Sequence, residues 1–165
     1  MYSKAKIGKH PIHPMLVAFP ITFYLLTFVS FLIYQTSSAD LFWFHMGFFS
    51  NYAAILTAVL AAIPGFVDWA FGIPERTEAR KHGTIHMILN LVTLAIFTLN
   101  AFVIRDSWDT GMVGVGLTLF VTGVGSLILL AAAYWGWEMI GHHKVGVDLT
   151  PEQEKLQDDY EKKAA

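Results

Sequence analysis

Four long stretches of the chain contain no Asp, Glu, Lys or Arg. They cover Pro11–Ala39, Leu41–Val67, His82–Ile104 and Thr110–Trp137. Each is longer than the about 20 residues that a helix needs to cross the hydrocarbon core of a bilayer. A backbone in lipid must satisfy its own hydrogen bonds, so helices are the default for such stretches. We therefore predict an all-α protein, a four-helix transmembrane bundle with up-down-up-down topology that sits in a lipid bilayer.

The polar turns between these stretches set the predicted limits of the helices and of the domain. The predicted spans are Met15–Gln35, Phe44–Phe71, Glu78–Arg105 and Gly111–Ile140. Together they form a transmembrane domain over residues 1–147. Residues 148–165 are dominated by charged side chains, and Thr150, Pro151 and Gln153 have the spacing of a helix cap. We predict a charged cytoplasmic tail there with a short helix.

Positive charge accumulates on one side of the predicted bundle. With four spans, both termini and the middle loop share a side, which carries Lys4, Lys6, Lys9, Arg76, Arg80, Lys81 and Lys144. The other side carries only Arg105. The positive-inside rule then predicts that both termini face the cytoplasm. No basic stripe of the kind that binds nucleic acid is present.

Most of the histidines fall on that same side. Six of the seven do so: His10, His13, His82, His86, His142 and His143. His82 and His86 are four residues apart and share one face of the third helix, which Asn90 continues. Pro11 and Pro14 predict that the segment around His13 is an extended lead-in and not a helix. We expect an imidazole-rich site at this end of the bundle.

The residue types favour haem as the occupant of that site. The chain has no cysteine, which excludes thiolate zinc sites, iron–sulfur clusters and c-type haem. Imidazole is a common ligand of iron, zinc and copper, and four-helix bundles hold cofactors between facing helices. We predict a b-type haem held by two histidines, with three candidates for axial ligation: His13, His86 and His143. Supporting roles, including proton transfer to a quinone, are predicted for three further residues: Asp68, His82 and Asn90.

Several alternatives stay open at this stage. The same histidines could hold non-haem zinc, iron or copper, or the chain could be a structural membrane anchor. Asp68 could pair with Arg80 or Lys81 instead of serving a cofactor. Glycines of the second and fourth helices could admit a macrocycle or allow close helix packing: Gly65, Gly114, Gly116, Gly123, Gly125 and Gly136. No motif of an independent enzyme occurs, so an electron-transfer subunit is favoured over an independent catalyst.

Four segments carry a resemblance to a known family. They are His13–Ile21, Gly65–Trp69, His86–Asn90 and Gly136–Val147. Together they resemble the bacterial four-helix membrane family called domain-of-unknown-function family 2231. The chain departs from the family at Ala18, where a histidine is frequent, at Gly141, where a tyrosine is common, and at Lys144, where a glycine is common. If the histidine missing at Ala18 is a ligand in the family, His10 or His82 would stand in for it here.

The resemblance implies a protein of the bacterial inner membrane with a haem or redox role. Combined with the histidines, it predicts an electron-transfer subunit that passes electrons between a quinone and a redox partner protein, alone or within a larger membrane complex. Whether the chain forms homo-oligomers is left open by the sequence.

Overall fold

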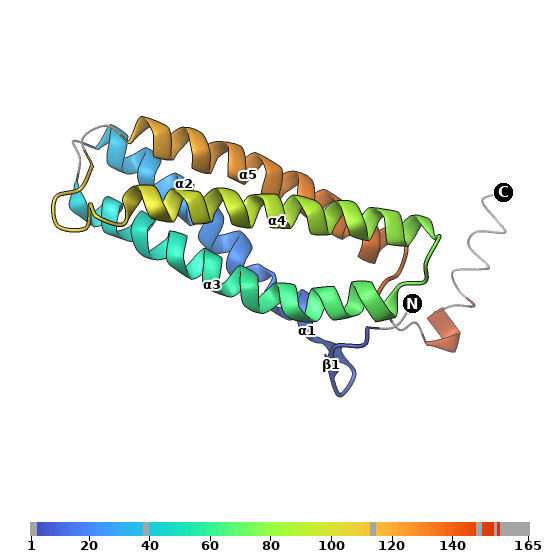
Figure 1. Cartoon of the computed structure of the whole chain (residues 1–165). Helices are drawn as coiled ribbons and strands as arrows, with labels where there is room; N and C mark the ends of the chain where they lie inside the picture. Colours follow the sequence, from blue (N-terminus) through green and yellow to red (C-terminus); the bar gives the residue numbers. More distant parts are fainter. Residues whose placement is uncertain (1–2, 38–39, 113–114, 148–149, 154, 156–165) are drawn as a thin grey trace.

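Four long helices pack side by side in the computed structural model, which describes residues 3–37, 40–112, 115–147, 150–153 and 155. They are α2 (Ala18–Thr36), α3 (Leu41–Gly72), α4 (Glu78–Ile104) and α5 (Gly116–Trp137) (Figure 1). The short helix α1 (Ile12–Leu16) precedes α2, and the π-helix η1 (Glu138–His142) follows α5. A small hairpin, β1 (Lys6–Ile7) with β2 (His10–Pro11), precedes α1. The predicted four-helix bundle is confirmed.

The helices match the predicted spans closely at most of their ends. The segments long and apolar enough to cross a membrane are Ile12–Thr36, Leu41–Gly72, Glu78–Ile104 and Gly116–His142. The largest difference is the start of the last span, which was expected at Gly111. Gly111 has a φ of +65°, a left-handed conformation that a helix does not accept, so it belongs to the preceding connection.

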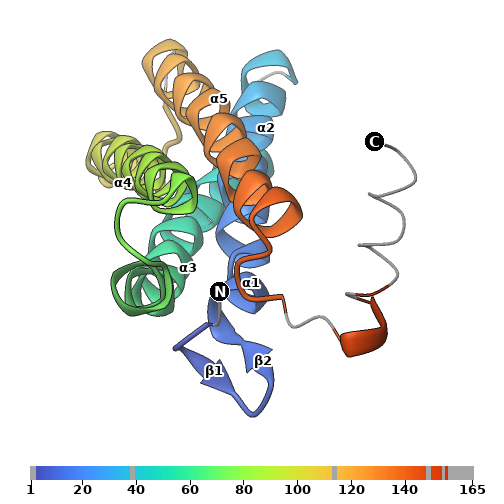
Figure 2. The ribbon, with the colours of Figure 1, turned by 90° about the vertical axis from the view of Figure 1, so that its right-hand side faces the viewer.

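The order of the helices around the bundle places two histidine-bearing helices diagonally. α2 packs along α3 and α4 packs along α5, while α3 also borders α4 and α2 borders α5 (Figure 2). α2, which continues directly from α1, therefore faces α4 across the interior. We call the end of the bundle that holds the Ile73–Thr77 connection and η1 the histidine end, and the other the opposite end.

Side chains fill the bundle from its middle to the opposite end. Two clusters of buried side chains make up this core, one of Phe31, Tyr34, Phe44, Ile104 and Val115, the other of Tyr24, Ala54, Phe97 and Leu129. Between them, Asn100 Nδ2 donates to Asn51 Oδ1 at 3.0 Å, and Asn51 Nδ2 donates to the Phe97 carbonyl at 3.1 Å. This polar pair joins α3 to α4 in an interior that also buries serine and threonine side chains.

The predicted extended lead-in ends earlier than expected. His10–Pro11 is extended and pairs with Lys6–Ile7, but His13 lies inside the helical turn α1. The expectation that Pro14 excludes a helix here was wrong. Pro14 is the third residue of α1, where the missing N–H costs nothing because first-turn N–H groups have no acceptor within the helix. His13 is thus carried by a turn of fixed geometry.

The described part of the tail has the predicted cap. Thr150 N donates to Gln153 Oε1 at 2.9 Å, and Gln153 N donates to Thr150 Oγ1 at 3.3 Å. This reciprocal pair is a capping box. The remainder of 148–165 lies outside the described residues, so the division into a domain and a tail stays a prediction.

Candidate histidine site

The structure brings together two of the three predicted axial ligands. His13 on α1 and His86 on α4 face each other across the bundle, with ring centroids 6.2 Å apart and ring planes at 82°. They come from helices that lie diagonally and are 73 positions apart in the sequence. The fold therefore assembles an imidazole pair inside the histidine end.

Each of the two rings is fixed by a backbone carbonyl of a neighbouring helix. His13 Nδ1 lies 2.8 Å from the Ala61 carbonyl oxygen, and His86 Nδ1 lies 2.7 Å from the Ala132 carbonyl oxygen. A carbonyl oxygen only accepts, so Nδ1 must carry the proton in both rings. A neutral imidazole protonated at Nδ1 keeps its lone pair at Nε2. Both histidines therefore offer the same nitrogen, Nε2, as a ligand.

Each ring also lies directly over a glycine. A Cβ placed on Gly65 would be 2.7 Å from His13 Nδ1, and one on Gly136 would be 2.9 Å from His86 Cε1. Gly65 follows Ala61 by one helical turn, and Gly136 follows Ala132 by the same spacing. An alanine carbonyl and a glycine one turn later thus form the same seat on α3 and on α5. Any larger side chain at either glycine would displace a ring.

The other glycines considered in the sequence do not reach this site. A Cβ on Gly125 would meet Phe97 at 2.6 Å, and one on Gly123 would meet Phe28 at 3.3 Å. These two allow close packing of aromatic side chains. Gly116 has no neighbour within 4 Å of its Cβ position, and Gly114 lies outside the described residues.

Asn90 lies against His86, as its predicted supporting role requires. Its Nδ2 donates to the His86 carbonyl at 2.8 Å, and the same nitrogen is 3.2 Å from His86 Nε2 and 3.4 Å from His86 Nδ1. Because His86 Nδ1 carries the proton that it donates to the Ala132 carbonyl, the ring nitrogen that can accept from the Asn90 amide is Nε2. Asn90 restricts where the imidazole can move.

His143, the third predicted axial ligand, forms a separate pair with His82. His143 Nε2 and His82 Nδ1 are 3.0 Å apart, so one ring donates and the other accepts. Trp135 packs on His82 with ring centroids 4.7 Å apart, and His142 packs on His143 at 4.9 Å. His82 precedes His86 by one turn of α4, so this second pair lies nearer the end of the bundle.

Asp68 is occupied by the N-terminal segment. Its carboxylate accepts from Ser3 Oγ at 2.9 and 2.8 Å, from Lys4 N at 2.6 Å and from Ala5 N at 2.9 Å. The alternative in which Asp68 pairs with Arg80 or Lys81 was wrong. Backbone N–H groups of the N-terminal segment donate to the carboxylate of Asp68. Arg80 and Lys81 have other partners.

Those partners lie on α3 and α4. Arg80 donates to the carbonyl oxygen of Trp69 and stacks on its indole ring, 3.7 Å from the centroid. Lys81 pairs with Glu78 at 3.6 Å on the surface of α4. Trp69 Nε1 also donates to Thr84 Oγ1 at 3.1 Å, so these contacts tie the end of α3 to the start of α4.

The positions at which the sequence departs from the resemblance differ in burial: Ala18 is exposed, and Gly141 and Lys144 are half-buried. Ala18 is exposed at the start of α2, His10 is exposed on β2, and His82 pairs with His143. Among the described histidines, His82 contacts His143 and not His13 or His86. Lys144 has a φ of +53°, in the left-handed region that favours glycine, which agrees with the glycine expected at this position.

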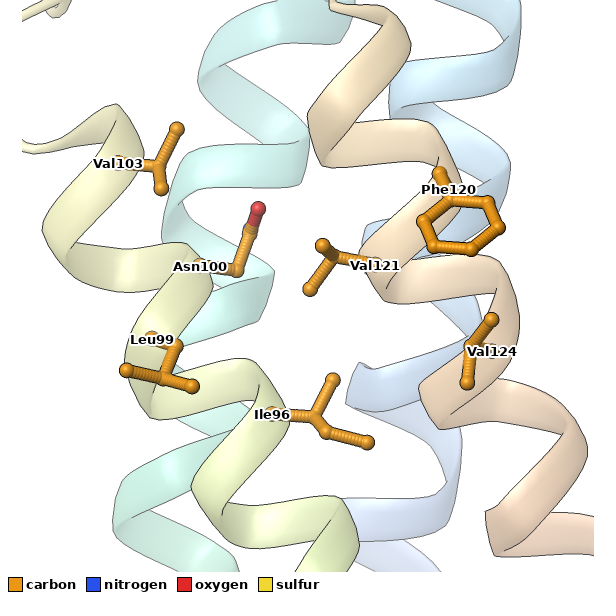
Figure 3. Close-up of a pocket in the computed structure, with 7 residues that line it drawn as sticks. All are labelled: Ile96, Leu99, Asn100, Val103, Phe120, Val121 and Val124. Atoms are coloured by element: carbon orange, nitrogen blue, oxygen red, sulfur yellow. The ribbon is translucent and has the colours of Figure 1, made fainter.

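Two further features of the described residues concern binding outside the histidine pairs. Within 3–37, 40–112, 115–147, 150–153 and 155, no group of three or more histidines and carboxylates is arranged to hold a metal ion. A groove of about 200 Å³ lies between α4 and α5, toward the opposite end (Figure 3). It is lined by Val, Ile, Leu and Phe side chains and by Asn100, which is 1% exposed and turns its amide nitrogen to Asn51. The groove offers apolar surface only.

The alanine–glycine seats were not found from the sequence. Gly65 and Gly136 stood out as small residues, but the carbonyls of Ala61 and Ala132 carry no side-chain signal. The seats share an alanine followed four residues later by a glycine, but the same spacing occurs at Ala79 and Gly83 in the third span, so the pattern alone does not mark them. The contact between Asp68 and Ser3, which we call the clamp, was also not predicted, because its hydrogen bond joins residues 65 positions apart in the sequence.

Comparison with known proteins gives one match. The sequence model of a family described as a predicted membrane protein (DUF2231) matches residues 9–149. No curated protein and no solved structure matches the chain. The matched region includes both histidine pairs, both seats and Asp68.

Proposed function

Because the chain belongs to the DUF2231 family of predicted membrane proteins, whose description gives no activity, we propose a function from the geometry of the site itself. We propose that the protein is an integral membrane b-type haem protein with His13 and His86 as the axial ligands. It would carry electrons between a quinone in the bilayer and a redox partner protein or a larger membrane complex. By the distribution of Lys and Arg, the haem would lie near the cytoplasmic face of a bacterial inner membrane.

The observation that carries this proposal is the separation of the two rings. A metal–imidazole bond is about 2.0–2.1 Å long, so two imidazoles on opposite sides of one metal stand with their centroids about 6 Å apart. The centroids of His13 and His86 are 6.2 Å apart. The two carbonyl bonds leave Nε2 unprotonated on both rings, which is the state that a metal requires.

The same residues favour haem over a non-haem metal. Structural zinc sites use four protein ligands, and catalytic ones use three. Among the described residues no third histidine or carboxylate joins this pair. A site with two imidazoles suits a metal whose other ligands belong to its own macrocycle, as in b-type haem. The second pair, His82 with His143, is closed by its own hydrogen bond.

Each residue of the site then has a defined task. Haem, when bound, supplies reversible one-electron transfer. The carbonyls of Ala61 and Ala132 hold the Nδ1–H groups, fix the orientation of the rings and raise the basicity of Nε2. Gly65 and Gly136 let the rings lie against α3 and α5, and Asn90 limits the movement of His86.

Absorption spectroscopy of the protein purified in detergent tests the proposal. We expect a Soret band and, after dithionite reduction, a sharp α band. His13→Ala and His86→Ala should each lose haem, whereas His82→Ala, which removes a histidine of the other pair, should retain it. The proposal is wrong if the wild-type protein, supplied with haem, binds none, or if haem remains at full occupancy in both His13→Ala and His86→Ala.

The angle between the rings gives a second readout that does not depend on activity. Nearly perpendicular imidazole planes, at 82°, should give the oxidised protein a strongly anisotropic low-spin ferric signal in electron paramagnetic resonance. A rhombic signal of the kind that parallel planes give would contradict the arrangement of His13 and His86 described above.

A further inference from the structure

A cationic hairpin extends sideways from the histidine end. It covers Lys6–Pro11, and we call it the N-terminal hairpin. Figures 1 and 2 show it beside α1, pointing away from the bundle axis and not along it. Its register pairs Lys6 with Pro11 and Ile7 with His10, and Gly8 occupies the turn with a φ of +60°. The haem proposal makes no use of this element.

The charge on this part of the chain is not compensated. No Asp or Glu occurs before Asp40 in the sequence. Lys4, Lys6 and Lys9 are exposed, and the ion pairs among the described residues lie elsewhere, on Glu78 and Asp106. Beside these lysines Ile7 is 70% exposed. The tip thus combines cations with a large apolar side chain that the described part of the chain leaves exposed.

Contacts at its base hold the hairpin in place. Ile12 N donates to the Ala5 carbonyl at 2.9 Å, and Asp68 accepts from Ser3, Lys4 and Ala5. Pro11 packs 3.7 Å from the position that a Cβ on Gly146 would take. The segments before, within and after the hairpin are therefore fixed to the bundle, and its tip has a set direction.

The membrane-spanning helices determine what this tip meets. Asp68 lies four residues before the end of α3, so the hairpin leaves the bundle about 6 Å from the helix end. An element that leaves there sideways from the helices runs along the membrane surface. Lysines at that level are attracted by anionic headgroups, and an apolar side chain between them enters the interface.

We propose that the N-terminal hairpin binds anionic phospholipids, with Lys6 and Lys9 on headgroup phosphates and Ile7 in the interfacial layer. An acidic protein would also attract the lysines. It would not account for an exposed isoleucine held along the plane of the membrane. The hairpin leads through Pro11 into α1, so this contact anchors the segment that carries His13. The proposal does not depend on haem.

The absence of native cysteines allows a direct test. His10→Cys, cross-strand from Ile7, is labelled with an environment-sensitive fluorophore, and the full chain is placed in nanodiscs of phosphatidylcholine with increasing phosphatidylglycerol. We expect a blue shift, and quenching by a nitroxide on the lipid headgroup, that grow with phosphatidylglycerol and shrink at high salt. Each lysine contributes about fivefold to affinity for an anionic surface, so Lys6→Gln with Lys9→Gln should weaken the response about 25-fold.

Lys81→Gln is the matched control, because Lys81 is an exposed lysine at the same end that lies off the hairpin. It should leave the response as in the parent protein. A label that remains in an aqueous environment at every lipid composition overturns the proposal and leaves an acidic protein as the partner. Equal quenching in neutral and anionic discs also overturns it, because headgroup charge would then play no part.

Discussion

Gly65→Ala tests the seat of His13 most directly. A Cβ at position 65 would stand 2.7 Å from His13 Nδ1, whereas ordinary van der Waals contact begins at 3.4 Å. The ring must therefore move away by about 0.7 Å. That movement lengthens its 2.8 Å bond to the Ala61 carbonyl, by at most the same amount, to about 3.5 Å, the limit of a hydrogen bond.

The expected cost follows from two opposing effects. Losing the hydrogen bond costs about 1 kcal/mol, and crowding a packed site costs about 1–3 kcal/mol. Alanine is better than glycine inside a helix by about 1 kcal/mol. The net change in the free energy of unfolding should therefore be a loss of about 1–3 kcal/mol. For a bound haem, a misplaced ligand should lower affinity by about 10–100-fold.

Unfolding in mixed micelles with increasing SDS, followed by circular dichroism, gives the free energy of the apo-protein. Haem titration followed at the Soret band gives the affinity. Gly116→Ala is the matched control, because a Cβ there has nothing within 4 Å and should be neutral or slightly stabilising. If Gly65→Ala is as stable as Gly116→Ala and binds haem as tightly as the wild type, the argument from the seat is refuted.

Two other contacts give predictions of their own. Asp68→Asn removes the charge that holds three donors of the N-terminal segment, so amide hydrogen exchange at Lys4 and Ala5 should accelerate at least about tenfold. Asp106→Asn, in an exposed pair with Arg105, should leave those amides unchanged, and equal exchange in both variants would contradict the clamp. Asn51→Leu and Asn100→Leu should each destabilise the bundle by about 1–3 kcal/mol. Their double variant should show a coupling energy of about 0.6–1.7 kcal/mol. Additive losses would show that the side-chain hydrogen bond between Asn51 and Asn100 contributes nothing to stability.

The bundle could be predicted from the sequence because a membrane-spanning helix is recognised from its own residues, without knowledge of the helices that pack against it. Stretches without charge set the four helices, and only the start of α5 differed notably, where Gly111 takes a left-handed conformation. The hairpin was not predicted, since two strands of two residues each leave no periodic pattern. The prediction of an extended segment at Pro14 was wrong because a proline in the first turn of a helix is harmless.

The gathering of histidines at one end followed from the topology, but their pairing did not. His82 and His86 share a face of α4 as expected, yet, one helical turn apart, they meet different residues. His86 reaches the Ala132 carbonyl and faces His13, while His82 reaches His143. The pairing of the histidine rings depends on how each helix is rotated about its own axis and on which helices lie diagonally in the bundle. The spacing of residues along one helix gives no information about either.

The repeated alanine–glycine seat divides the molecule into two equivalent parts. One part, α1 to α3, holds His13 on its own Ala61 and Gly65, and the other, α4 and α5, holds His86 on its own Ala132 and Gly136. Neither imidazole needs the opposite part to be oriented. A cofactor that takes one ligand from each would act as a staple across the bundle. Its loss would remove that link between the two parts, which the hydrogen bond between Asn51 and Asn100 would still join.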